Sequence, residues 1–275
     1  SGQIVCPGFI DLHCHPQDAE IFEVQARDGV TTTLELEVGT GDIDEFYGRW
    51  EGKAAINFGA SIGHIPVRMK VMKDPGDMLP VGDGAYKAAS EPQINEMKFL
   101  MNKGLDEGAL AMGFGLAYTP LASRWEALEM FRVAASFGAS CHVHMRGMGH
   151  KEPLNSIEGL SELIAASATT GAPLHVVHVN SSGQPTIQRP MEAANLIIRA
   201  RTRGLSVHLS LDTFTYEIPC GGSHEENLAS YIKVQTEAAI VFAKFADAMN
   251  VEYLSPGNEH EGGFQGSCLD PGFSQ

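Results

Sequence analysis

Short apolar runs rich in β-branched residues alternate along the chain with longer segments that have the spacing of amphipathic helices. The alternation predicts a parallel sheet, and eight such runs predict a closed (β/α)8 barrel of the α/β class, whose typical size of about 250 residues suits this chain. The expected strands are Ile4–His13, Thr31–Val38, Ala54–Ile62, Gly108–Phe114, Ala139–Met145, Leu174–Val179, Leu205–Leu211 and Val251–Leu254. The expected helices are Pro92–Glu107, Ser123–Phe137, Ile157–Thr170, Met191–Arg203 and Glu226–Met249.

We expect one domain over residues 1–261 that contains the whole barrel. Glycine and proline recur between Lys73 and Ala88, and this predicts a long loop there. The glycine-rich residues 262–275 are expected to form a loose C-terminal tail.

Composition narrows the range of partners. The chain has 34 acidic and 19 basic residues, a formal charge of −15, which argues against nucleic acid or an anionic membrane as the main partner. No apolar run reaches the roughly 18 residues that a membrane span requires. Five cysteines without a CxxC pair argue against a disulfide framework and predict a reducing, cytoplasmic compartment. We therefore expect a small-molecule substrate, and a homo-oligomer stays open.

Two histidines follow the apolar part of the first expected strand. Alternate side chains of a strand share a face, so Asp11, His13 and His15 point the same way. Two imidazoles at this spacing can converge on one divalent metal ion, at about 2.0–2.1 Å for zinc. Active sites of barrels lie at such strand ends. The alternative is a pair of loop histidines without a ligand role.

The second expected strand has two glutamates on one face. Glu35 and Glu37 alternate with Leu34, Leu36 and Val38. The outer face of a barrel strand packs against helices, so the apolar face is expected outside and the glutamates inside. Carboxylates in an interior are costly unless a cation or hydrogen-bond donors compensate them. The pattern favours a metal-bridging glutamate, and an ordinary amphipathic strand is the alternative.

Histidines also end the fifth and sixth expected strands, at His144 and His178. A lone histidine on a strand is usually a core residue, but the order HxH, Glu, His, His over strands one, two, five and six argues for a shared metal site. His64 with Arg68 offers either a bidentate site for a substrate carboxylate or a salt bridge at the start of a helix. Tyr118 is expected in the pocket or in the packing of its rim.

Taken together, these segments resemble the amidohydrolase superfamily, and within it the D-aminoacylase-like branch of N-acyl-D-amino-acid deacylases. The sequence PGFIDLHCH from Pro7 to His15 resembles the first-strand motif of the superfamily, and His144-Met145-Arg146 resembles the fifth-strand HMR of the branch. The resemblance covers roughly residues 4–223. Its other segments are Gly29–Thr32, Gly63–Arg68, Gly108–Tyr118, His178 and Asp212–Tyr216.

The resemblance implies a divalent metal centre with one or two zinc ions, which hydrolyses the N-acyl bond of a modified amino acid. It implies that His13 and His15 hold one ion and that His144 and His178 hold a second. The branch has a bridging cysteine after the second strand, and we expect Glu37 to take its place here. The residues expected to bind substrate are His64, Arg68, Tyr118, Arg146, Tyr216 and Ser223.

Two features of the superfamily are not found. One is the small β-sandwich domain, and the other is the eighth-strand SDG, whose aspartate is a metal ligand and proton shuttle. Asp212, Glu252 and Glu259 are the candidates for that catalytic role. These departures leave alternatives open: a catalytically impaired barrel, another cyclic-amide hydrolase or deaminase of the superfamily, or a glycosidase-like barrel with two carboxylates about 5–9.5 Å apart.

Overall fold

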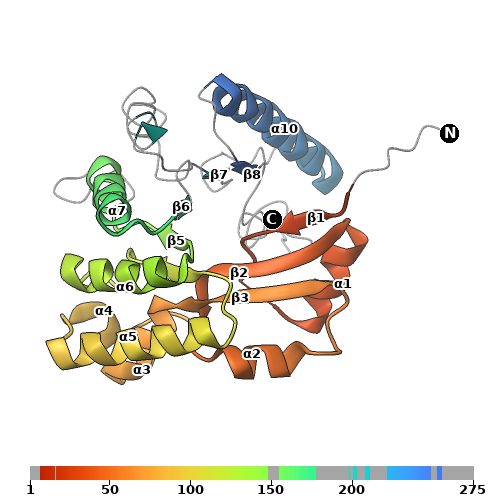
Figure 1. Ribbon diagram of the computed structural model, residues 1–275. Helices are drawn as coiled ribbons and strands as arrows, with labels where there is room; N and C mark the ends of the chain where they lie inside the picture. The colour runs from red at the N-terminus through yellow and green to blue at the C-terminus, as the bar shows by residue number, and fades with distance from the viewer. Residues whose placement is uncertain are drawn as a thin grey trace. The chain divides into compact units, whose positions relative to one another are not determined.

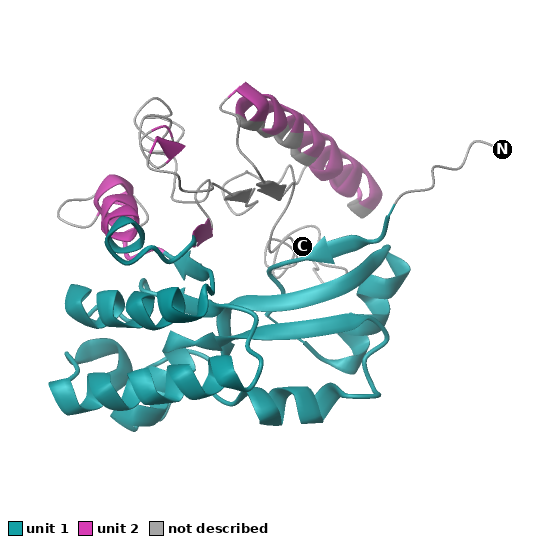
Figure 2. Ribbon diagram, viewed as in Figure 1, with its two compact units in different colours: residues 1–144, 166–173 teal, residues 145–165, 174–275 magenta. Residues whose placement is uncertain are grey.

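The structure is a computed structural model, and its elements are shown in Figure 1. It describes residues 7–15, 17–147, 155–177, 198, 201–202, 208–210, 222–248 and 253–255. The chain forms two compact units, one of residues 1–144 with 166–173 and the other of residues 145–165 with 174–275 (Figure 2).

In the first unit, parallel strands alternate with helices. Its strands are β1 (Phe9–Asp11), β2 (Val30–Thr40), β3 (Asn57–Gly63), β4 (Met112–Gly115) and β5 (Cys141–His144), and each pairs in parallel with the next. Figure 1 shows α2, α3 and α5 along one side of β2 and β3. The helices are α1 (Ala19–Arg27), α2 (Ile43–Trp50), α3 (His64–Met72), α4 (Asp83–Tyr86), α5 (Glu91–Asp106) and α6 (Arg124–Phe137).

The described elements of the second unit are β6, β7, β8, α10 and most of α7. Strands β7 and β8 pair in parallel as a two-stranded sheet. None of the helices in the described ranges is long and apolar enough to cross a membrane. The bounds are β6 (Leu174–Val177), β7 (His208–Ser210), β8 (Tyr253–Ser255), α7 (Ser156–Thr170) and α10 (His224–Ala248).

The α/β class predicted from the sequence is confirmed. Six of the eight expected strands follow one another in sequence order in one sheet, β1 to β6, which is the strand order of a partial (β/α)8 barrel. Closure into eight strands stays a prediction. The expected helix at Met191–Arg203 lies largely outside the described residues, as do the tail and the domain boundary at residue 261.

The expected helices did not include α1, α2 or α3, although the salt-bridge alternative for His64 and Arg68 assumed a helix start where α3 begins. Each has only 8 or 9 residues, too few for the apolar period to stand out. Local capping explains two of them, because Asp18 accepts a hydrogen bond from the Ile21 N–H and Asp42 accepts one from the Glu45 N–H. Part of the expected loop at Lys73–Ala88 forms the single turn α4.

Strand β2 contains a bulge between two positions that pair with β3. Glu35 pairs with Ala60 and Thr40 pairs with Ile62. Between these two pairs the chain advances five residues along β2 but only two residues along β3. The backbone N–H groups of Glu37, Val38 and Gly39 leave the ladder there and all donate to Glu35 Oε1, at 3.1, 3.0 and 3.3 Å. The Glu35 carboxylate therefore satisfies the donors that the bulge would otherwise leave unpaired.

Glycines on the neighbouring strands allow this bulge to lie close to them. A Cβ atom on Gly63 of β3 would lie 1.9 Å from the Val38 carbonyl oxygen, and one on Gly113 of β4 would lie 2.2 Å from the Glu37 carbonyl oxygen. Both contacts are with backbone atoms, so a rotamer change cannot relieve them. The bulge thus requires glycine at two positions that are distant in sequence.

A cluster of buried charged groups on α3 and α6 connects these two helices and the chain around α4. Glu126 on α6 accepts from His64 Nε2 at 2.7 Å and forms an ion pair with Arg68, and all three residues have no exposed surface. The Arg68 guanidinium also donates to the Gly84 carbonyl at 2.7 Å and to the Lys87 carbonyl. Burial raises the pKa of Glu126, but the hydrogen bonds and charges of His64 and Arg68 outweigh it and leave the pKa below its ordinary value.

We predict that Glu126→Gln lowers the free energy of unfolding by about 3–5 kcal/mol, because it leaves the buried Arg68 without its counter-charge. Urea unfolding at neutral pH measures this change. The matched control is Glu45→Gln on α2, which removes an exposed pair with Arg49 and should change the free energy of unfolding by only about 0.3–0.5 kcal/mol. Equal effects of the two variants would contradict the prediction.

The same cluster predicts a pH dependence. A carboxyl group whose pKa is lowered on folding stabilises the protein fully above its unfolded pKa, and this stabilisation is lost as the pH falls through the lowered folded value. Glu126→Gln removes this titration. The drop in unfolding free energy between pH 6 and the acid range should therefore be smaller in the variant than in the wild type.

We predict that Gly113→Ala destabilises the chain by about 1–3 kcal/mol, because the new methyl group overlaps the backbone of the bulge. Thermal or urea unfolding measures the effect. Gly48→Ala is the matched control: Gly48 lies on the exposed side of α2 with open space around it, and alanine there should stabilise by up to about 1 kcal/mol. A neutral Gly113→Ala would show that the bulge has room to move.

Candidate metal centre

The residues after β1 turn towards β2. His13 forms an isolated antiparallel bridge with Glu35, and the Cys14 N–H donates to the Leu34 carbonyl at 3.2 Å. The Asp11 carboxylate accepts from the His13 N–H at 3.0 Å. These bonds fix the segment from Asp11 to His15 against the strand that carries the glutamates.

Three potential ligand atoms converge at this point. His13 Nε2 lies 3.0 Å from His15 Nε2 and 3.1 Å from Glu37 Oε2, and all three ligand atoms lie within 4.8 Å of one another. Two ligands of a tetrahedral zinc ion, each at about 2.0–2.1 Å, would be roughly 3.3 Å apart. Two histidines and one carboxylate form a donor set typical of catalytic zinc, which keeps a further position open. The residues present therefore fit a divalent metal ion.

Glu37 lies between a histidine of the segment after β1 and a histidine at the end of β5. Its Oε2 faces His13, and its Oε1 lies 2.9 Å from His144 Nδ1 at the end of β5. The Glu37 side chain is 1% exposed. One carboxylate thus has each oxygen directed to a different imidazole, which is the arrangement a bridging ligand requires.

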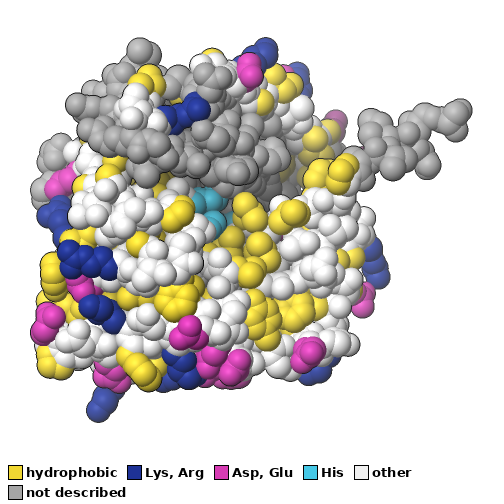
Figure 3. Space-filling view, viewed as in Figure 1, with side chains coloured by type: hydrophobic (Ala, Val, Ile, Leu, Met, Phe, Trp, Pro, Cys, Tyr) yellow, Lys and Arg dark blue, Asp and Glu magenta, His cyan; other side chains and the backbone are white. Residues whose placement is uncertain are grey.

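Two neighbours hold the histidines in place. Glu35 Oε2 lies 2.6 Å from His15 Nδ1, on the opposite side of the ring from the Nε2 atom that faces His13. The ring of Tyr118 lies against that of His144, with 4.8 Å between the centroids. On the face of the molecule drawn in the space-filling view, histidine side chains are visible next to hydrophobic ones (Figure 3).

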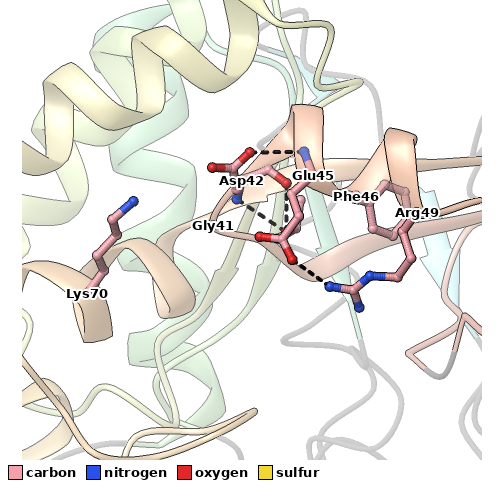
Figure 4. Close-up of a pocket in the computed structure, with 7 residues that line it drawn as sticks. Gly41, Asp42, Glu45, Phe46, Arg49 and Lys70 are labelled. Atoms are coloured by element: carbon pink, nitrogen blue, oxygen red, sulfur yellow. Dashed lines mark hydrogen bonds and ion pairs between the residues drawn. The ribbon is translucent and has the colours of Figure 1, made fainter.

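Two hollows adjoin the loop after β2. One has a volume of about 290 Å³, and its wall combines Asp42, Glu45 and Arg49 with Lys70 of α3 (Figure 4). The other, of about 220 Å³, is lined by His15 and Glu35 and shares Arg49 with the first. Their volumes lie near or below the lower end of the roughly 300–1,000 Å³ range of small-molecule pockets.

The remaining residues expected to bind substrate have other contacts in the structure. His64 and Arg68 form the buried cluster with Glu126, so the geometry supports the salt-bridge interpretation over the substrate-binding one. Arg146 forms two hydrogen bonds with Glu162, at 3.1 and 3.2 Å. The Ser223 hydroxyl forms hydrogen bonds with Glu226 at the start of α10.

Five of the expected site residues lie outside the described part of the chain, so their roles stay predictions. They are His178, Asp212, Tyr216, Glu252 and Glu259.

The sequence alone did not reveal the roles of two acidic residues that have defined hydrogen-bond partners in the structure. Glu126 was not singled out, although Ser123 and Glu126 have the spacing of a capping box and the Ser123 hydroxyl accepts from the Glu126 N–H at 3.0 Å. That spacing signals a helix start but not the pairing with Arg68. Asp11 was noted only for its face, whereas its carboxylate accepts from the His13 backbone and from Gln25 on α1.

No protein-family model matches this chain. It is 26% identical over 251 residues to a D-aminoacylase from Alcaligenes xylosoxydans xylosoxydans, in an alignment that covers 78% of this chain and 48% of that protein. It is also 26% identical over 247 residues to an N-acyl-D-glutamate deacylase from the same organism, over 78% of this chain and 47% of that protein. The chain spans about half the length of these relatives.

Solved structures show the same similarity in fold. An N-acyl-D-glutamate deacylase from Bordetella bronchiseptica, complexed with zinc and a phosphonate inhibitor, matches with a TM-score of 0.58 and 22% identity, over 74% of this chain and 47% of that chain. A D-aminoacylase assigned to a novel subset of amidohydrolases matches with a TM-score of 0.60 and 23% identity, over 76% and 48%. This chain therefore resembles the D-aminoacylase branch of the amidohydrolases in both sequence and fold.

Proposed function

We propose that this chain is a metal-dependent hydrolase of amide C–N bonds and that its substrates are N-acylated D-amino acids. The observation that carries the proposal is the convergence of His13 Nε2, His15 Nε2 and Glu37 Oε2 where β1 and β2 end. The similarity to a D-aminoacylase and to an N-acyl-D-glutamate deacylase supports the reaction and the substrate class. Because the chain spans about half of those proteins, the activity of the whole relatives is part of the proposal.

The metal ligands follow from the contacts. His13, His15 and Glu37 would hold one divalent ion, and Glu37, His144 and His178 would hold a second. A divalent ion bound here would lower the pKa of a coordinated water to about 7 and polarise the amide carbonyl. Zinc suits a set of imidazole and carboxylate ligands.

The protein side chains orient this centre and move protons. The Asp11 carboxylate holds the His13 backbone, and Tyr118 packs against the His144 ring. Burial of Glu37 and His144 keeps bulk water away from the ligands. A carboxyl group must deliver a proton to the leaving nitrogen, and we assign that role to one of Asp212, Glu252 and Glu259.

We predict that the wild-type chain, purified without chelator, binds one or two equivalents of zinc or a similar ion. The double variant His13→Ala/His15→Ala should lose it, and Glu37→Gln should weaken zinc binding by at least about tenfold, because each removes ligands from the site. Elemental analysis and zinc titration measure this. Glu45→Gln removes an exposed carboxylate in the same unit and should bind zinc as the wild type does.

The second prediction concerns turnover. The metal-loaded chain should hydrolyse N-acetyl-D-amino acids faster than their L-enantiomers, and a chelator should abolish the reaction until zinc is restored. Release of the free amino acid measures the rate. A chain that binds zinc in the histidine site but releases no amino acid from either series would refute hydrolysis and support a binding-only barrel.

A further inference from the structure

We propose that Glu35 is a positioning residue that fixes the tautomer of His15 and the backbone of the β2 bulge with one carboxylate. The inference deepens the proposed function, on which it rests, because both of its targets carry ligand atoms of the candidate metal site. Glu35 itself is not assigned as a ligand.

The first half of the argument concerns Glu35 Oε1. This oxygen accepts three backbone N–H groups, from Glu37, Val38 and Gly39, and the residue is only 5% exposed. Successive N–H groups that point to one centre form an anion-binding nest. Oε1 therefore acts only as an acceptor, and it holds the backbone from which the Glu37 side chain projects to His13 and His144.

The second half concerns Glu35 Oε2. This oxygen lies 2.6 Å from His15 Nδ1, which is a close hydrogen-bond contact. Carboxylate oxygens accept hydrogen bonds, so we assign the proton of this contact to His15 Nδ1. In a neutral imidazole with its proton on Nδ1, the lone pair is on Nε2. The Nε2 atom of His15 is the one that faces His13 in the ligand set.

The two oxygens of the Glu35 carboxylate thus act on two proposed ligands, Glu37 on β2 and His15 in the segment after β1. Oε1 determines where the bulge with Glu37 lies, and Oε2 determines which His15 nitrogen can bind a metal ion. Carboxylates that hold metal-binding histidines in this way typically affect metal affinity by about 10–100-fold.

A glutamine at this position separates the two effects. Its amide has one oxygen that accepts and one NH2 group that donates. Three N–H groups face the Oε1 position, so the amide oxygen must occupy it and the bulge keeps its acceptor. The NH2 group then faces His15 Nδ1, which must become an acceptor. The imidazole proton moves to Nε2 and blocks the lone pair that a metal ion requires.

The test is Glu35→Gln, measured first in the metal-free protein. Long-range nitrogen–proton NMR correlations of the His15 ring, at a pH where the ring is neutral, should change from the Nδ1–H pattern to the Nε2–H pattern. Zinc affinity, measured by competition with a chromophoric chelator, should fall by about 10–100-fold. The melting temperature should change little, because the amide oxygen still satisfies the bulge. Glu45→Gln is the matched control and should leave all three measurements unchanged.

Glu35→Ala provides the second variant. It removes both acceptors, so the backbone N–H groups of Val38 and Gly39 should exchange with solvent much faster than in the wild type, whereas Glu35→Gln should leave them protected. An unchanged His15 tautomer together with wild-type zinc affinity in Glu35→Gln would overturn the proposal. A wild-type chain that binds no zinc would instead refute the proposed function, and the tautomer measurement would still decide the role of Glu35.

Discussion

The hydrogen bonds between the Glu35 carboxylate and the β2 bulge are the constraint on which the described site depends. A bulge inside a sheet removes N–H groups from the ladder, and buried N–H groups without partners are costly. Glu35 Oε1 accepts three of them at once. Because the strand can then leave its regular path, Glu37 is free to turn both of its oxygens towards imidazoles, at 3.1 and 2.9 Å.

Two buried carboxylate groups of the first unit, those of Glu126 and Glu37, have different partners. Glu126 lies next to the guanidinium of Arg68, so its negative charge has a permanent counter-charge within the fold. Glu37 faces His13 and His144 instead, and imidazoles carry a charge only when they are protonated. A buried anion with imidazole neighbours is stabilised further by a cation, and the same nitrogens supply its ligands. The first group therefore stabilises the fold, and the second is suited to hold an ion.

The local part of this site could be predicted from the sequence. The HxH spacing placed His13 and His15 side by side, and the period of two placed Glu35 and Glu37 towards the same interior. The bulge could not be predicted, because it depends on Gly63 and Gly113, which contact it from other strands. The environment of His64 and Arg68 could not be predicted either, because it also depends on a contact between distant parts of the sequence. Their partner Glu126 lies 62 and 58 residues further along the chain. Short-range patterns report periodicity, whereas pairing over such distances is decided by packing.

The bridging position that we propose for Glu37 is the chemical difference that matters most between this chain and the branch that it resembles. The resemblance implies a cysteine after the second strand, and a thiolate would offer one soft sulfur atom to both ions. Glu37 offers two oxygens instead, and each faces a different histidine, one in the segment after β1 and one at the end of β5. A carboxylate is a harder ligand, so the site should accept hard divalent ions more readily than a thiolate-bridged one. A bridging carboxylate must also have a defined orientation, because its two oxygens point in different directions. The bulge that Glu35 holds in place fixes the orientation of Glu37.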